Sequence, residues 1–310
     1  MVFGSVLVEL TPVREGERLR DAGLLLPLPS GAATNFALSA ARLGVSTGMI
    51  SRVGDDEWGE WLRAHLRDLG LAVEHVQPMP GELSTVSFCW MDRSGGKTFY
   101  FYRFPGYCDP LAAVGPDDVT PAWFEGCRCF DFTEATIRRE PLRLAAFAAA
   151  ELARALGLLV VYAVNYRPSG WAGREEEFVP TQGHACSLAD VVLLNSDEAT
   201  MLTGLTDLPA AAESIASLGP RTVVITSGEA GSLLWHEGEA ATVAPFEVEV
   251  LYDIGAGDTY HAGLVAGLLH GLSAADAGRL AAAAAALKIS RPATLDQLPT
   301  WSEAAALAGL

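Results

Sequence analysis

Apolar residues recur in two different rhythms along the first 70 positions. NFALSAARLG at 35–44 and EWGEWLRAHLRDLG at 57–70 have apolar residues at helical spacing, and each ends in a glycine that suits a helix C-terminus. SVLVEL at 5–10 and STGMISRVG at 46–54 are short, apolar and strand-like. This alternation predicts a parallel sheet covered by helices.

The alternation breaks at residues 84–104, STVSFCWMDRSGGKTFYFYRF. Two β segments are joined there by DRSGG, a turn of the hairpin type, and no helix separates them. An antiparallel hairpin inside an α/β chain predicts a flap or lid, and GLLLPLP at 23–29 is a candidate for further lid strands.

The helix and strand patterns resume after residue 140. We expect helices at 143–157, 196–204, 210–219, 258–271 and 274–290, strands at 158–167, 190–195 and 222–228, and a hairpin at 231–246. The chain would thus have seven or more sheet strands, mostly parallel. No repeat, low-complexity tail or linker divides it, so a single domain over residues 1–310 is predicted.

Composition and charge narrow the class of protein. Half of the 310 residues are hydrophobic, but no apolar run reaches the roughly 18 residues of a membrane span. The N-terminus lacks the basic region of a secretory signal, and the five cysteines show no metal or disulfide spacing, which predicts free thiols in the cytoplasm. A net charge of −17 argues against nucleic acid and anionic membranes as partners. It leaves a small anionic substrate open, because one or two arginines can hold a phosphate or carboxylate.

The most informative stretch is DIGAGDTYHAG at 253–263. A dinucleotide fingerprint would need a glycine where Tyr260 stands. Gly255, Ala256 and Gly257 could form an anion hole at a helix start, with Asp258 beside it as a general base. The alternative is an aspartate that merely stabilises a helix N-terminus. Spacing alone leaves these last two interpretations even.

Two further segments have both a ligand-binding and a structural interpretation. Asn195 and Glu198 could hold a magnesium ion through water, or form a capping box. Asn165 and Arg167 follow a strand, where open α/β sheets bind ligands, and Arg167 could meet a substrate carboxylate or phosphate, or a surface carboxylate.

The aromatic segment YFYRFPG at 100–106 could shield a cleft from water and present one positive charge, Arg103. It could equally pair two copies of the chain, and we expect a homodimer. The nearby GGKT is not a phosphate loop, because Met91 stands at its required first glycine and β segments flank it.

In sequence order, these segments resemble the ribokinase-like (PfkB) carbohydrate kinases. The late signature of that family reads roughly D-T-T-G-A-G-D, and YDIGAGD stands here at 252–258. Its early Gly-Gly stretch and helical Asn correspond to SGAATNFALSAARLG at 30–44. GDDEWG, the NSDE pattern, VVITSGEAG and KISRPATLDQLPT match further segments in the right order, so the resemblance covers essentially the whole chain.

The resemblance implies an α/β three-layer sandwich with a central, mostly parallel sheet and a small β lid, built from insertions at approximately 9–29 and 82–105. It implies ATP-dependent phosphorylation of a sugar hydroxyl, with Asp258 as the base, the anion hole at Gly255, Ala256 and Gly257, and Asn195 and Glu198 organising Mg²⁺. The residues implied to bind the sugar are Glu9, Gly31, Asn35, Phe101, Arg103, Asn165 and Arg167. Those implied to bind the nucleotide are Asn195, Thr226, Ser227, Gly228 and Gly231.

Within the family, YFYR and VNYRPSGW are similar to 2-keto-3-deoxygluconate kinases, and FYRFPG is also similar to fructokinases. Arg103 and Arg167 favour an acid sugar, so 2-keto-3-deoxygluconate is the expected substrate. Fructokinase and nucleoside kinase are the alternatives within the fold. A non-catalytic sugar-binding protein is the alternative outside the enzyme class, and a dehydrogenase is a weaker one.

Three positions depart from the family pattern. Tyr252 replaces the first aspartate before GAGD, with Asp253 one place later. That aspartate helps to form a monovalent-cation site in some members, so K⁺ activation is doubtful here. Ala163 stands at the aspartate of a DxNxR pattern, and Ser5 where an acid is frequent.

Overall fold

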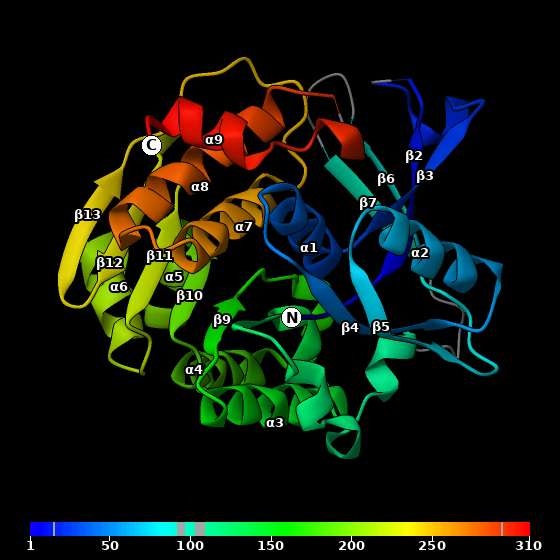
Figure 1. The fold of residues 1–310 in the computed structure, drawn as a ribbon, viewed down its shortest axis with the longest axis horizontal. Coiled ribbons are helices and arrows are strands. Elements are labelled where there is room, and N and C mark those ends of the chain that lie inside the picture. The colour runs from blue at the N-terminus through cyan, green and yellow to red at the C-terminus, as the bar shows by residue number, and fades with distance from the viewer. Residues whose placement is uncertain (15, 92–96, 103–108, 293) are drawn as a thin grey trace.

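The computed structural model describes residues 1–14, 16–91, 97–102, 109–292 and 294–310. Within them, one large sheet has the strand order β13-β12-β11-β10-β9-β8-β1-β4-β5 (Figure 1). Its strands are β1 (Val2–Phe3), β4 (Gly48–Gly54), β5 (Ala72–Met79), β8 (Cys129–Thr133), β9 (Leu159–Ala163), β10 (Val191–Asn195), β11 (Thr222–Thr226), β12 (Ser232–His236) and β13 (Glu239–Val243). All neighbours from β11 to β5 pair in parallel, and β12 and β13 form the expected antiparallel edge hairpin.

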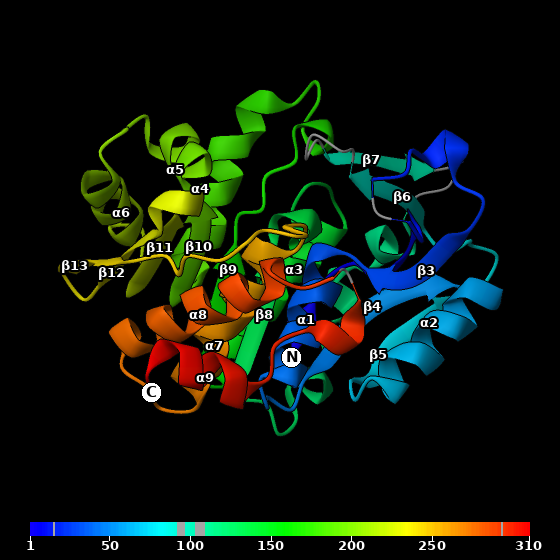
Figure 2. The same cartoon turned by 90° about the horizontal axis from the view of Figure 1, so that it is seen from above.

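Helices cover both faces of this sheet, which confirms the predicted three layers (Figure 2). One layer contains α1 (Ala32–Arg42), α2 (Glu57–Asp68), α7 (Ala256–Leu269), α8 (Ala274–Ile289) and α9 (Trp301–Ala308). The other contains α3 (Leu142–Ala155), α4 (Phe178–Leu188), α5 (Ser196–Thr203) and α6 (Leu208–Ala216). None of the helices in the described ranges is long and apolar enough to cross a bilayer.

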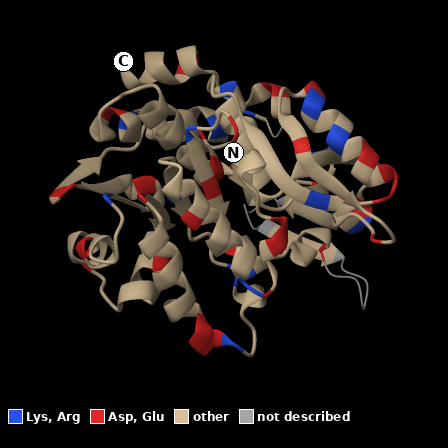
Figure 3. Cartoon of the chain, turned by 60° about the horizontal axis from the view of Figure 1, so that its bottom comes forward, with Lys and Arg blue, Asp and Glu red and all other residues tan. Residues whose placement is uncertain are grey.

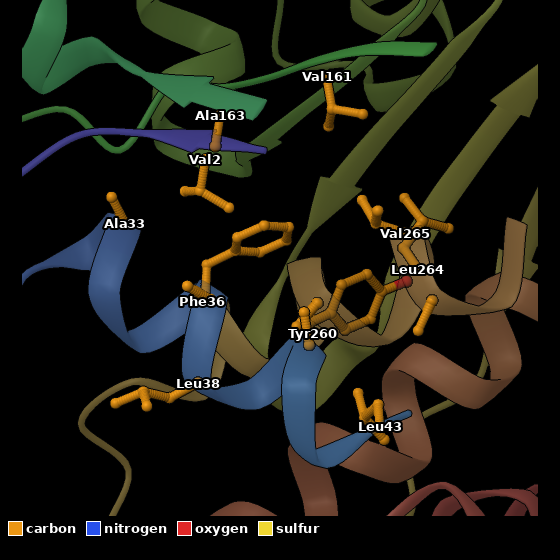
Figure 4. Close-up of a cluster of buried hydrophobic side chains, with 14 of the residues drawn as sticks. Val2, Ala33, Phe36, Leu38, Leu43, Val161, Ala163, Tyr260, Leu264 and Val265 are labelled. Atoms are coloured by element: carbon orange, nitrogen blue, oxygen red, sulfur yellow. The ribbon is translucent and has the colours of Figure 1, made fainter. Parts of the chain in front are cut away.

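The central strands are apolar throughout because both of their faces are buried. On β9, Val161 and Ala163 belong to the core under α1 and α7, whereas Val160 and Tyr162 belong to the core under α3 and α4. Figure 4 shows the first of these cores, in which Phe36 of α1 lies near the sheet. Successive residues of a strand point to opposite faces, so an unbroken apolar run supplies both cores.

A second, small sheet has the strand order β3-β2-β6-β7 in the described part of the chain. It consists of β2 (Leu7–Pro12), β3 (Leu25–Ser30), β6 (Val86–Met91) and β7 (Lys97–Tyr102). The β6–β7 hairpin is confirmed by antiparallel pairing, although its predicted DRSGG turn lies outside the described residues. The GLLLPLP segment does supply a lid strand, β3.

The strand predicted over SVLVEL is present as β2, but it belongs to the small sheet, and the neighbouring strand β1 was not predicted. The large sheet takes only the two residues of β1, and the chain then crosses to the small sheet as β2. Phe3 of β1 and Val8 of β2 are both fully buried, so hydrophobicity alone does not mark the point at which the chain changes sheets. β5, β8, α4 and α9 were also not predicted.

Small residues bring α7 against α8. A Cβ added to Gly263 would lie 2.7 Å from the Cα of Ala281, and one added to Gly267 would lie 2.8 Å from the Cα of Ala277. The two helix backbones are therefore in near contact, which explains the alanine-rich sequence of α8. This contact holds α7, and hence its N-terminus, in place.

We predict that Gly263→Ala lowers the free energy of unfolding by about 1–3 kcal/mol, because the added methyl group overpacks the α7–α8 contact. Gly183→Ala in α4 is the matched control, since a Cβ there meets nothing within 4 Å. It should raise stability by about 0.5–1 kcal/mol through helix propensity. Urea unfolding of both variants measures the difference, and equal effects would contradict the packing argument.

Candidate active site

Helix α7 begins in a left-handed turn at the carboxyl edge of the sheet. Gly255 precedes the helix with a φ of +83°, which a residue with a side chain adopts only under strain. First-turn amides have no acceptor inside a helix, and that of Ala256 donates to the carbonyl of Asp253 at 3.2 Å. A Cβ on Gly257 would meet nothing within 4 Å, so a ligand could approach the backbone closely. The predicted anion hole is therefore the N-terminus of α7, with the Ala256 amide engaged in the turn.

Asp258 lies in the first turn of α7 and is held by a residue far away in the sequence. The side-chain amide of Asn35 donates to Asp258 Oδ2 at 3.0 Å. Asn35 is in the first turn of α1, which starts at Gly31 with a φ of +118°. A Cβ on Gly31 would lie 2.7 Å from the carbonyl oxygen of Ser5, so only glycine fits. Two helix N-termini thus meet at this carboxylate.

Burial raises the pKa of Asp258 above the ordinary aspartate value. The hydrogen bond from Asn35 opposes this rise, and so do the nearby basic groups of Arg167, His261 and Lys288. A carboxylate with a raised pKa is a better proton acceptor than an exposed one, provided that the pH keeps it ionised. In the described structure this side chain accepts from Asn35 of another helix and makes no hydrogen bond that caps its own helix.

A pocket adjoins this carboxylate and is lined in part by Glu9, Ser30, Asn35, Gly255 and Lys288. Glu9 comes from β2 of the small sheet, is 8% exposed, and accepts a hydrogen bond from the Ser30 hydroxyl at 3.0 Å. Burial raises the pKa of Glu9, against the effects of Ser30 and Lys288. Glu9 and Asn35, two of the predicted sugar-binding residues, therefore line one pocket.

The predicted capping box at the start of α5 is confirmed. Asn195 Oδ1 accepts from the Glu198 amide, and Glu198 Oε2 accepts from the Asn195 amide, both at 2.8 Å. Glu198 Oε1 accepts from the amide of Tyr166 at 2.7 Å, directly after Asn165, which has a φ of +41°. A carboxylate offers about four lone-pair sites, so a metal-bound water can still bind. The donor set fits a magnesium ion held through water, not one bound directly by a free carboxylate.

The turn after β11 has an unsatisfied polar atom. Ser227 Oγ is buried and has no hydrogen-bond partner within the described ranges. An unpaired buried hydroxyl costs free energy, which a bound ligand would recover. Gly228 has a φ of +56° and open space where a side chain would be. Gly231 has a structural reason for being glycine, because a Cβ there would lie 2.3 Å from the carbonyl oxygen of Val243.

Thr226 ends β11 directly beside Asn195, the last residue of β10. The predicted nucleotide and magnesium residues therefore lie together at the carboxyl edge of two parallel neighbours. Figure 3 shows Lys and Arg positions scattered among Asp and Glu positions along the ribbon.

Arg167 is one of these basic residues. It is exposed just after β9, and its Nη1 donates to the Tyr166 carbonyl at 2.9 Å. Burial raises the pKa values of Asp258, Glu134 and Glu198, and the charge of Arg167 partly opposes that rise in all three. In the part of the chain that the structure describes, it forms no ion pair, contrary to the surface salt-bridge alternative.

Phe101 and Arg103 are the two lid residues predicted to contact the sugar. Phe101 is in β7 and 51% exposed, whereas Arg103 lies outside the described residues. The homodimer stays a prediction.

The sequence pattern of the pfkB family of carbohydrate kinases matches residues 1–301 of this chain. The chain belongs to the pfkB family. It is a carbohydrate kinase, a phosphotransferase with an alcohol group as acceptor.

Relatives of this kinase act on different acceptors. It is 28% identical over 316 residues to "Probable fructokinase-4" of Arabidopsis thaliana, covering 98% of this chain and 95% of the relative. It is 29% identical over 311 residues to "5-dehydro-2-deoxygluconokinase" of Geobacillus thermodenitrificans (strain NG80-2), covering 98% and 90%. The solved aminoimidazole riboside kinase from Salmonella enterica, complexed with aminoimidazole riboside and an ATP analog, superposes with a TM-score of 0.83 at 26% identity, covering 100% and 99%. These names leave the acceptor of this kinase open.

Sequence reasoning missed two charged residues of the kinase. Glu134 follows the unpredicted strand β8, is fully buried, and bonds to Arg138 at 2.6 Å and to the Trp171 indole. The acidic residue directly after the apolar run CFDFT was the available signal. Lys288 lines the pocket from the last turn of α8, and the signal was a lone lysine in an alanine-rich helix.

We predict that Asn35→Leu moves the acidic limb of the kcat/KM profile of this kinase to higher pH. Asn35 donates to the ionised form of Asp258, so its loss raises the pKa of the carboxylate further and the base protonates sooner as pH falls. A pH profile of kcat/KM from pH 4 to 9 measures the shift. An unmoved limb in a variant with normal thermal stability would show that another group titrates.

Proposed function

We propose that this kinase transfers the γ-phosphate of ATP to a primary hydroxyl of a sugar acid, with 2-keto-3-deoxygluconate as the expected substrate. The observation that carries the chemistry is the Asn35-held carboxylate of Asp258 at the open N-terminus of α7. The observation that favours an acid is Arg167, an unpaired cation in the described structure whose charge reaches that carboxylate. The relative whose name contains a gluconate supports the same class.

In the proposed reaction, Asp258 accepts the proton of the sugar hydroxyl. The hydroxyl oxygen forms a bond to the γ-phosphorus as the bond from phosphorus to the β,γ-bridging oxygen breaks, and the electron pair leaves with ADP. The amides of the α7 N-terminus stabilise negative charge on the transferred group, because they and the helix dipole point towards it. The protein supplies mostly positioning and electrostatics, as in phosphoryl transfer generally.

The other side chains divide between the two substrates. Glu9 accepts hydrogen bonds from sugar hydroxyls beneath the small sheet, which acts as the lid. Ser227 and the turn to Gly231 hold the nucleotide, and the unpaired hydroxyl of Ser227 gains a partner when it binds. Asn195 and Glu198 would hold Mg²⁺ through water, and the ion would supply positive charge against the phosphates.

We predict that Asp258→Asn folds normally and loses about two to four orders of magnitude in kcat. The amide is isosteric with the carboxylate but cannot accept the proton. A coupled ADP-release assay measures turnover, and circular dichroism checks the fold. Near-normal turnover would refute the assignment of the base. Tight sugar binding by the wild type without ADP release would instead favour a non-catalytic sugar-binding protein.

Fructose is the second candidate acceptor, favoured by the Arabidopsis relative. We predict that 2-keto-3-deoxygluconate gives a higher kcat/KM than fructose in an ADP-release panel that also contains 5-dehydro-2-deoxygluconate, ribose, tagatose and adenosine. Arg167→Gln should lower kcat/KM for the acids by about tenfold or more, the worth of a charged hydrogen bond, and change that for neutral sugars less. Arg67→Gln, an exposed arginine of α2, is the control. Activity confined to a neutral sugar would overturn the preference for an acid.

A further inference from the structure

The segment that leads into the anion hole is tied to the end of α8. The amides of Leu251 and Tyr252 both donate to the carbonyl of Ile289, at 2.8 and 3.0 Å. The Lys288 ammonium donates to the Tyr252 carbonyl at 3.2 Å and lies 4.5 Å from the centre of the Tyr252 ring. Both polar groups of the Tyr252 backbone are therefore held by two consecutive residues of α8.

Lys288 is also part of the candidate active site. It is only 9% exposed and lines the same pocket as Glu9 and Asn35. A Cβ on Gly255 would lie 3.7 Å from Lys288 Cε, so the lysine stem runs along the start of the anion hole. A buried ammonium is costly unless it is partnered, and here the partners are a carbonyl, an aromatic face and a helix C-terminus.

We propose that Lys288 is a positioning residue for phosphoryl transfer: its ammonium is a tethered cation that fixes the turn from Tyr252 to Gly255 and offsets the carboxylates of the pocket. The inference rests on the proposed kinase reaction. Tyr252 stands where the family pattern has an aspartate, and the ammonium lies on the carbonyl of that same residue. A cation that the chain supplies itself makes a dissolved one unnecessary, so turnover needs no potassium.

The lysine acts through geometry and through charge. Geometrically, the Tyr252 carbonyl lies just before the turn, so the group bound to it fixes how the chain enters the turn. Within the turn, the Asp253 carbonyl accepts a hydrogen bond from the Ala256 amide. Electrostatically, Lys288 favours the ionised forms of Glu9 and Asp258. Arg167 and His261 also favour ionised Asp258, so the loss of Lys288 alone should shift its titration without abolishing it.

Hydrogen–deuterium exchange of the free protein tests the geometric part without relying on catalysis. In Lys288→Met, amides from Leu251 to Gly257 should exchange faster than in the wild type, because the turn has lost its anchor. Lys288→Arg should stay closer to the wild type, and Arg279→Met, an exposed residue of the same helix, should change nothing there. If these amides exchange in Lys288→Met at the same rates as in the wild type, the proposal is overturned.

Kinetics test the functional part. Lys288→Met should lower kcat by about ten- to hundred-fold for acid and neutral sugars alike, and move the acidic limb of kcat/KM to higher pH. Methylammonium should restore part of the turnover of Lys288→Ala, whereas the larger tetramethylammonium should not. Wild-type turnover should be unchanged when tetramethylammonium replaces potassium.

Results that overturn the role of Lys288 differ from those that overturn the proposed function. A rise confined to KM for acids would make Lys288 a substrate-binding residue and overturn the positioning assignment, and so would wild-type dependence on potassium. If Lys288→Met does not fold, wild-type turnover with tetramethylammonium in place of potassium and the behaviour of Lys288→Arg still test the proposal. If no sugar is phosphorylated but exchange in the turn changes as expected, the proposed function fails while the anchoring of the turn stands.

Discussion

A single hydrogen bond, from Asn35 to Asp258, joins two helix starts that are 223 residues apart in the sequence. It places a carboxylate where the N-termini of α1 and α7 meet, in surroundings that raise its pKa. A negative charge is favoured there by the helix dipoles and disfavoured by burial, and the amide donor balances the two effects. Glu9, Asn35 and Lys288 line the pocket beside these helix starts, whereas the predicted nucleotide residues lie at the ends of β10 and β11.

The position of α7 depends on the absence of side chains. Gly263 and Gly267 let its backbone pass against α8, and larger residues there would displace α7, which carries Asp258, relative to Asn35 of α1. The same close approach brings the last turn of α8, with Lys288, to the segment before Gly255. The alanine tract of α8 thus helps to position the candidate active site, although it contains no chemistry of its own.

Local patterns predicted the elements whose residues interact mainly with near neighbours in sequence. The capping box of Asn195 and Glu198 is closed within one helical turn, so spacing was enough to predict it. The split between β1 and β2 was missed because burial is similar in both sheets, and only pairing with distant strands separates Phe3 from Leu7. Short or edge strands such as β8 and β5 carry weak periodicity, and they too were missed.

The sequence by itself determined the alternating α/β architecture, a helix that starts at the Gly-Ala-Gly stretch and the presence of a carboxylate beside it, because these follow from local periodicity and backbone freedom. The order of motifs along the chain determined the family. Only the tertiary structure decided that Asn35 holds Asp258, that Glu9 reaches the pocket from another sheet, and that Lys288 lies on the Tyr252 carbonyl. Each of these contacts joins residues more than 20 positions apart, and the close packing of α7 against α1 and α8 brings them together.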